Sequence, residues 1–228
     1  MNISKQLLLA LSASLPLAVL AEITPLKEYE KMWEQRSKDK RSQEEFAGWW
    51  GNENAISRIL LRLHIMQKGY KSLLDVGCGF CKDFEPLKKS CPQTHYCALD
   101  ISSTFVSLAL ERGIDVVQAR AEQMPYDDSA IELVFCRHLL EHLNSYQDAI
   151  KEMVRVASKE VIIVFFINPD KNTTDKMGVI NVGGFTTYQN RYCKSKIEGF
   201  LKTLDKVKSF SWQDVKNKDE SILHIVLE

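Results

Sequence analysis

The sequence lacks an excess of charge of either sign. It has 30 Lys and Arg residues against 30 Asp and Glu residues, so its formal net charge at pH 7 is zero. A protein that binds nucleic acid through the phosphates carries a surplus of positive charge. We therefore expect no bulk binding of nucleic acid. Internal repeats and low-complexity linkers are also missing, and with 45% hydrophobic residues the composition is that of an ordinary globular protein.

Hydrophobic runs long enough to cross a membrane are missing too. Lys5 precedes an apolar stretch from Leu7 to Ala21, a layout typical of a secretory signal. Fifteen residues at about 1.5 Å each reach only about 22 Å, short of the roughly 30 Å hydrocarbon core. We interpret residues 1–21 as a signal-like or anchor segment, and membrane association would run through residues 3–21. An amphipathic helix packed on the domain is the alternative.

The six cysteines would form an even disulfide set if the chain were exported. Cys97 and Cys136 instead lie within apolar runs that predict buried strands, where a free cysteine behaves as a small hydrophobe. We therefore favour reduced cysteines, which conflicts with export. The favoured location is cytoplasmic, or membrane-associated and facing the cytoplasm, with export as the alternative.

From residue 72 onward, short apolar runs alternate with helical patterns. This alternation predicts βαβ units around a parallel sheet, so the fold class is α/β. The strands are expected at SLLDV, HYCALD, IDVVQA, IELVFC and EVIIVFFI, with a closing antiparallel hairpin formed by VKSFSW and SILHIVL. The loop from Asn168 to Thr187, rich in Gly, Asn and Thr, is expected to be irregular.

Residues 22–70 are expected to form an N-terminal helical lid region, ahead of a domain over residues 71–228. A charged stretch from Lys27 to Glu45 predicts a solvated helix. A second helix is expected from about Asn54 to Gln67. Its apolar residues follow the helical period: Ile56, Ile59, Leu60, Leu63 and Met66.

A third glycine, usual in dinucleotide-binding loops, is missing after the first strand of this domain. Gly77 and Gly79 follow SLLDV directly, but Lys82 stands at the third position. This is the edge at which an α/β sheet binds nucleotide-like ligands. Asp100 ends the next strand, 21 residues after Gly79, where a carboxylate can accept hydrogen bonds from ribose hydroxyls. A ligand without a pyrophosphate would not need the third glycine.

With these motifs, the chain resembles the class I S-adenosylmethionine-dependent methyltransferases, in particular their broad small-molecule, type 11-like family. The resemblance runs from about Leu73 to Ile167 through DVGCG, the ALD acid, AEQMPYDDSAIELVF and HLLEHL. It implies a Rossmann-like, seven-stranded, mostly parallel sheet with a C-terminal antiparallel hairpin strand. It also implies an enzyme that uses S-adenosylmethionine to methylate an unidentified, small-molecule substrate.

The resemblance implies a set of cofactor-binding residues. Asp75, Gly77, Cys78 and Gly79 would lie at the methionine end, and Asp100 with Ile101 at the ribose. Ala121 and Glu122 would lie beside the adenine, and the stretch from Cys136 to His138 would face the sulfonium. His138 is the candidate catalytic base. Arg120 departs from the family, which commonly carries an adenine-contacting Asp there, so the adenine contact is in doubt.

Three alternatives remain open. The letters CGFCK, from Cys78 to Lys82, resemble the redox centre of thioredoxin-like oxidoreductases. HLLEH, from His138 to His142, has the letters of an inverted zinc-protease motif, but packing after the fourth strand explains it, so we expect no metal there. A catalytically inactive cofactor-binding scaffold would also carry the same motifs.

Overall fold

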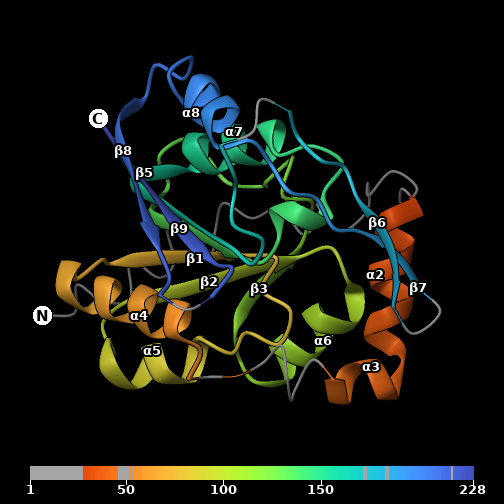
Figure 1. Ribbon diagram of the computed structural model, residues 1–228. Coiled ribbons are helices and arrows are strands. Elements are labelled where there is room, and N and C mark those ends of the chain that lie inside the picture. Colours follow the sequence, from red (N-terminus) through yellow and green to blue (C-terminus); the bar gives the residue numbers. More distant parts are fainter. Residues whose placement is uncertain (1–27, 46–51, 53, 172–173, 183–184, 217) are drawn as a thin grey trace, which may run out of the picture.

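The computed structural model describes residues 28–45, 52, 54–171, 174–182, 185–216 and 218–228 (Figure 1). The signal-like segment and the aromatic residues at 46, 49 and 50 lie outside the described residues. Within this part of the chain, no helix is both long and apolar enough to cross a membrane.

A seven-stranded sheet in the order β3-β2-β1-β4-β5-β9-β8 forms the centre of the molecule. Strands β1 to β5 pair in parallel, β9 runs antiparallel to β5, and β8 runs antiparallel to β9. The strands are β1 (Ser72–Val76), β2 (His95–Asp100), β3 (Asp115–Gln118), β4 (Ile131–Arg137), β5 (Ala157–Phe165), β8 (Val207–Asp214) and β9 (Ser221–Leu227). The predicted fold class and the closing hairpin are confirmed.

Helices cover both faces of this sheet (Figure 1). One face packs against α4 (Ile56–Lys68), α5 (Phe84–Ser90) and α6 (Ser103–Glu111), and the other against α7 (Gln147–Val156) and α8 (Lys194–Leu201). Residues of β5 alternate between the two layers: Val161 and Ile163 belong to the core under α7, whereas Ile162 and Val164 belong to the core under α4. All four are at most 1% exposed, as a strand covered on both faces requires.

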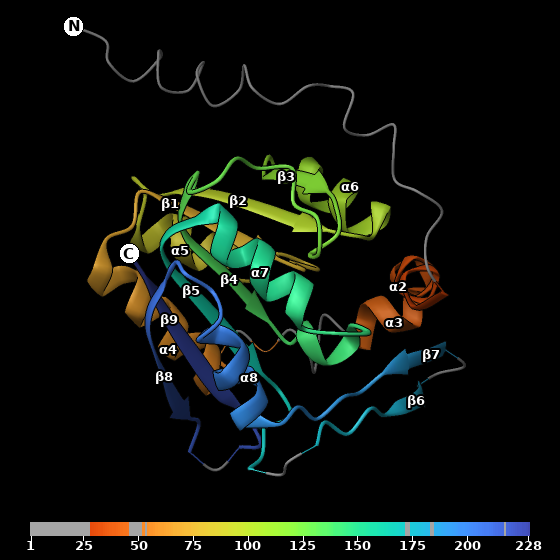
Figure 2. The same ribbon diagram turned by 90° about the horizontal axis from the view of Figure 1, so that it is seen from above.

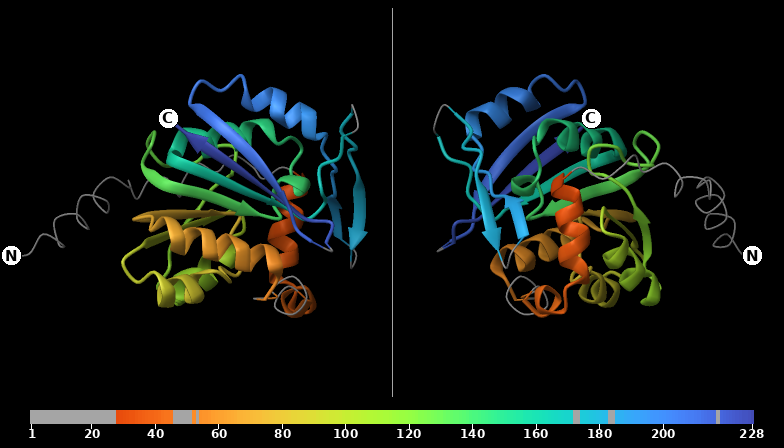
Figure 3. Two further views of the ribbon diagram at one scale, coloured as in Figure 1. Left: turned by 60° about the vertical axis from the view of Figure 1, so that its left-hand side comes forward. Right: turned by 90° about the vertical axis from the view of Figure 1, so that its right-hand side faces the viewer.

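A small hairpin and two helices stand at one end of the sheet. The hairpin consists of β6 (Val179–Val182) and β7 (Phe185–Tyr188), within the segment for which the sequence predicted an irregular loop. Helices α2 (Glu28–Lys38) and α3 (Lys40–Glu45) lie beside it, and Figures 2 and 3 show α2 standing next to β7. The prediction missed this hairpin because its two strands, VINV and FTTY, have only four residues each and lie in a segment otherwise rich in turn residues.

The expected helix is present as α4, but its apolar row is not its buried face. The predicted apolar row faces outward, with Ile56, Ile59, Leu63 and Met66 each 39–47% exposed. The face toward the sheet carries Ser57, Arg58, Leu61 and Ile65 instead. Helical periodicity identified the helix but not its orientation, because Ser57 and Arg58 face inward and find polar partners inside the protein.

The expectation of a solvated helix over residues 27–45 is wrong. Both α2 and α3 are helices, yet Glu30 is 2% and Arg36 is 3% exposed. Charged side chains are rarely buried unless they are paired. Glu30 and Arg36 line the cavity described below, so α2 forms part of its wall.

Candidate active site

A cavity of about 200 Å³ opens at the carboxyl ends of β1, β2 and β4, the edge at which α/β sheets bind ligands. The lining comes from eight parts of the chain. These parts are three residues of α2 (Glu30, Trp33, Arg36), Arg58 of α4, Gly77–Phe80 with Lys82, Leu99–Ile101 with Phe105, Ala119–Glu122, Arg137–Leu139 with His142 and Leu143, Phe166, and the hairpin region (Ile180, Thr187, Gln189).

The glycine loop after β1 forms the floor of this cavity. Gly77 and Gly79 have φ angles of 70° and 51°, a conformation that favours glycine. A Cβ at Gly77 would lie 2.8 Å from Leu139 Cδ1, so that position is closed by packing. A Cβ at Gly79 would meet nothing within 4 Å, so its backbone faces open space that a ligand can enter.

Asp100 lies at the end of β2 and ties the glycine loop to the next turn. Its Oδ2 accepts a hydrogen bond from the Gly79 N–H at 2.8 Å, and its Oδ1 accepts one from the Ser102 N–H at 2.9 Å. Burial raises the pKa of Asp100 to about 6, so the group is mostly ionised at pH 7. Each carboxylate oxygen keeps acceptor capacity for a hydroxyl in the cavity.

Two of the predicted cofactor-binding residues do not line the cavity. Cys136 is fully buried in the core under α7. Asp75 is 5% exposed and accepts a hydrogen bond from the Tyr96 hydroxyl, which lies on the sheet face covered by α4 and α5. Burial, and then the nearby Asp83 carboxylate, raise the pKa of Asp75 to about 7. Asp75 therefore lies outside the cavity lining, while the other predicted residues line the cavity.

Arg120 is paired with a residue of α2. Its Nε and Nη2 donate to the two carboxylate oxygens of Glu30, at 2.6 and 2.7 Å. The two side chains are 12% and 3% exposed, so the pair is largely removed from water. Arg120 thus fixes α2 over the end of the cavity near Ala121 and Glu122, where the resemblance placed the adenine.

His138 follows β4 with a φ angle of 58°, a strained conformation for a residue with a Cβ. Its Nε2 is buried, has no hydrogen-bond partner, and lies 3.6 Å from Glu220 Oε1. Arg137 Nη1 is 3.4 Å from its Nδ1. Burial, followed by the charge of Arg137 and Arg58, holds the pKa of His138 well below its usual range. The imidazole is therefore neutral at pH 7.

Two arginines lie close to His138 in the cavity wall. Arg58 of α4 is paired with the buried carboxylate of Asp83, while Arg137 donates from Nη2 to the Ser57 hydroxyl at 3.0 Å. Burial, followed by the neighbouring Arg58, lowers the pKa of Arg137 to about 10, so its guanidinium remains charged at pH 7. This side of the cavity suits a ligand with a carboxylate or another anionic group.

The HLLEH segment does not form a zinc-protease helix. Only Leu140–His142 are helical, as the 3-10 turn η3, so the two histidines are not one turn apart on an α-helix. His142 donates from Nδ1 to the Tyr188 carbonyl at 2.7 Å, and its ring stacks on Phe166. Among the described residues, neither histidine belongs to a group close enough to share an ion.

Glu141, between these histidines, holds the segment after β5. It is 1% exposed, and its Oε1 accepts from the Phe166 N–H at 2.6 Å and the Ile167 N–H at 3.2 Å. Burial raises the pKa of Glu141 to about 8. Because Phe166 lines the cavity, this carboxyl group positions part of its wall.

Residues 22–70 were expected to form a helical lid region, and α2 lies in the cavity wall, but the individual contacts of α2 and the hairpin were not predicted. Trp33 contacts the His142 ring edge-on, with centroids 4.9 Å apart, and Thr187 and Gln189 line the cavity beside it. The available signals in the sequence were Trp33 and the charged residue Glu30 of α2. Their partners are about 100 residues or more away in the chain, so local patterns could not identify the contacts.

Comparison with known proteins agrees with this geometry. Residues 74–165 match the family described as "Methyltransferase domain". An ajmaline N-methyltransferase from Rauvolfia serpentina is 32% identical over 123 residues, which is 48% of this chain and 41% of that protein. The chain therefore spans less than half the length of that relative.

Solved structures share the fold. A magnesium protoporphyrin IX methyltransferase from Synechocystis, with S-adenosylmethionine bound, has a TM-score of 0.60 at 12% identity and covers 90% of this chain and 100% of its own. A 1,6-didemethyltoxoflavin-N1-methyltransferase from Burkholderia thailandensis, with its substrate and S-adenosylhomocysteine bound, has a TM-score of 0.61 at 12% identity, covering 91% and 93%. The thioredoxin-like alternative finds no support here.

Proposed function

Since residues 74–165 form a domain of the class I S-adenosylmethionine-dependent methyltransferases, we propose that this protein transfers a methyl group to a small molecule bound beside His138. The single observation that carries the proposal is the position of Asp100. It is buried at the strand end, anchors the Gly79 backbone, and still lines the cavity.

The residues of the cavity fit S-adenosylmethionine. Gly79 leaves open space above its backbone, and Asp100 presents carboxylate oxygens for two ribose hydroxyls. Ala121 and Glu122 line the end expected to receive the adenine, and Arg58 offers a positive charge for the methionine carboxylate. The buried Nε2 of His138, without a partner, is a polar atom that an arriving molecule can satisfy.

When bound, S-adenosylmethionine supplies a methyl group that its sulfonium has already activated. The protein has to hold the acceptor in line with that methyl group and exclude water. The wall formed by Trp33, Phe166 and Thr187 closes the cavity on the side of β4 and serves both purposes.

An acceptor with a hydroxyl or a protonated amine must also lose a proton. We place proton uptake on His138 Nε2, since a neutral imidazole can accept a proton and Glu220 Oε1, 3.6 Å away, stabilises the resulting charge. A ring that accepts at Nε2 carries its hydrogen on Nδ1, so the 3.4 Å contact with Arg137 must lengthen. Arg137, beside His138, favours an acceptor with an anionic group.

The test has two stages. Calorimetric titration of the full chain with S-adenosylhomocysteine should show one saturable site, and labelled S-adenosylmethionine should then transfer methyl groups to a component of a metabolite extract, with acidic components methylated preferentially. Binding without transfer to any extract would favour the inactive scaffold. Absence of binding by a folded chain would overturn the proposal.

A further inference from the structure

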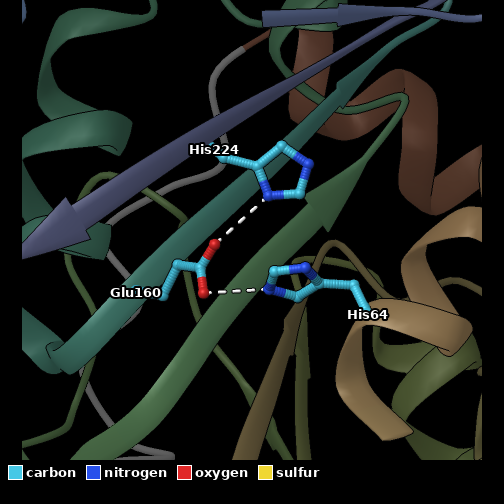
Figure 4. Close-up of side chains that lie close together, drawn as sticks. All are labelled: His64, Glu160 and His224. Carbon is cyan, nitrogen blue, oxygen red and sulfur yellow. Dashed lines mark hydrogen bonds and ion pairs between the residues drawn. The ribbon is translucent and has the colours of Figure 1, made fainter. Parts of the chain in front are cut away.

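A cluster of two histidines and one carboxylate lies on the sheet face covered by α4, apart from the candidate active site (Figure 4). We propose that His64, Glu160 and His224 form a binding site for one divalent transition-metal cation of the zinc class, which fastens α4 to the β5–β9 pair.

Regular structure brings these residues together. Glu160 pairs with Val226 across β5 and β9, and His224 lies two residues from Val226, so Glu160 and His224 project from the same face of the sheet. His64 comes from α4, which packs over that face. Figure 4 shows both imidazoles turned toward the carboxylate, one facing each of its oxygens. Each ligand is therefore held by a different, well-packed element, which favours a precise site.

The distances are close to those of a metal site. His64 Nε2 is 2.9 Å from Glu160 Oε2, and His224 Nδ1 is 3.2 Å from Glu160 Oε1. One ligand atom from each residue lies within 4.8 Å of the others. Zinc bonds of about 2.0 to 2.2 Å in tetrahedral geometry separate ligand atoms by roughly 3.4 Å. Small side-chain movements would thus make room for the ion.

The chemistry of the donors selects the kind of cation. Two imidazoles and one carboxylate suit zinc and related transition metals better than calcium or magnesium, which prefer oxygen ligands only. The carboxylate of Glu160 faces His64 Nε2 with one oxygen and His224 Nδ1 with the other, so the three donors converge on one point.

Tyr70 contacts two of the proposed ligands. Its hydroxyl donates to Glu160 Oε2 and lies 3.2 Å from His64 Nε2, and the residue is 5% exposed. Hydrogen bonds of this kind to a ligating carboxylate fix its orientation. The side chains of His64 and His224 are 21% and 16% exposed, so an ion can enter from solvent and water can take the fourth position.

The site is separate from the cavity. Glu160 lies near the start of β5, whereas Phe166 follows its end, about 20 Å away at roughly 3.3 Å per residue. An ion at Glu160 would not touch the transferred methyl group. It would instead secure α4, which also carries Arg58 in the cavity wall. The expected role is structural.

The experiment uses the full, untagged chain after treatment with a chelator. Zinc titration by calorimetry near pH 7.5 should show one ion per chain and a higher melting temperature. Removal of a ligand, in His224→Ala or Glu160→Gln, should weaken zinc binding by more than about 100-fold, because loss of an outer-shell partner alone costs 10- to 100-fold. Tyr70→Phe keeps all three ligands and should show the smaller loss.

Two controls separate this site from other zinc ligands in the chain. His95→Ala alters the other cluster of this kind among the described residues, with Cys97 and Asp115, and should leave zinc affinity unchanged. Cobalt bound to the proposed site should lack the near-ultraviolet absorption of a cobalt–thiolate bond, which binding to Cys78 and Cys81 would produce.

Two results would overturn the proposal. One is the absence of saturable zinc binding by a chain that still binds S-adenosylhomocysteine, which would make the cluster a hydrogen-bonded network only. The other is unchanged affinity in a folded His224→Ala chain. His64→Gln provides a second variant at a partly exposed helical position if His224→Ala fails to fold.

Discussion

Arg120 and Glu30 form a two-point ion pair that joins the segment after β3 to helix α2. Nitrogen–oxygen distances of 2.6 and 2.7 Å and low exposure of both side chains distinguish it from a surface ion pair. The residue that departs from the resembled family thus has a partner more than 80 positions earlier in the chain. Arg120 therefore has a role of its own in this protein, because its pairing with Glu30 holds α2 over the cavity.

Replacing either member of this pair should weaken cofactor binding. Glu30→Gln and Arg120→Gln each leave a buried polar group without its charged partner, so each should lower both S-adenosylhomocysteine affinity and melting temperature. Because contacting residues do not act additively, the double variant should lose less affinity than the sum of the single losses, with a coupling of about 0.5 to 3 kcal/mol. Titration calorimetry on all four proteins measures it. Additive losses would show that the pair does not position α2.

Asp100→Ala should weaken S-adenosylhomocysteine binding by about 10-fold to 150-fold. Hydrogen bonds to a charged group contribute about 1.5 to 3 kcal/mol, and about 1.4 kcal/mol corresponds to tenfold. The melting temperature should also fall, because the Gly79 and Ser102 N–H groups lose their acceptor. A variant that melts lower but binds like the parent would restrict Asp100 to a structural role.

The ionisation of Asp100 should also appear in the pH dependence of binding. Its pKa in the folded protein is raised to about 6, so the carboxylate becomes protonated as the pH falls through 6. Affinity for S-adenosylhomocysteine should therefore decrease below about pH 6, and Asp100→Asn should remove most of this decrease. Titrations at several pH values between 5 and 8 test this, and equal slopes for the two proteins would contradict it.

His138→Ala should lower turnover far more than cofactor affinity when the acceptor must lose a proton. General-base catalysis contributes about 10²- to 10⁴-fold. Since the pKa of His138 lies well below its usual range, its imidazole stays neutral through pH 6 to 7, where an ordinary histidine would gain a proton. Parallel losses of turnover and affinity would instead mark His138 as a packing residue.

Glu141→Gln should change how stability depends on pH. The folded pKa of Glu141 is raised to about 8 from an ordinary value of 4.5, so the folded state retains this proton better than the unfolded state. Its contribution is fully present below about pH 4.5 and is lost as the pH rises through 8. From pH 5 to 8.5 the parent should therefore lose more stability than the variant. Denaturant unfolding at these two pH values measures the difference, and parallel curves would contradict the assignment.

The sequence predicted the parallel strands well because each is a short apolar run between turns. SLLDV and HYCALD coincide with β1 and β2 to the residue. The glycine loop and Asp100 followed from their place after these strands. Orientation was harder to predict: the apolar row of α4 faces outward because Ser57 and Arg58 find partners inside. The wall from α2 depends on long-range pairs, such as Arg120 with Glu30, that no local pattern contains.

The position of β9 imposes an order on the folding of the newly made chain. β9 lies between β5 and β8, although both of those strands are synthesised before it. β8 can join the sheet only through β9, and the outer edge of β5, with its apolar Ile162 and Val164, has no described strand beside it until then. While the chain is still attached to the ribosome, the five parallel strands from β3 to β5 can assemble, but with an unpaired edge that invites aggregation. Completion of the sheet must await synthesis of β9, so a ribosome stalled shortly before residue 221 would hold an open-edged intermediate.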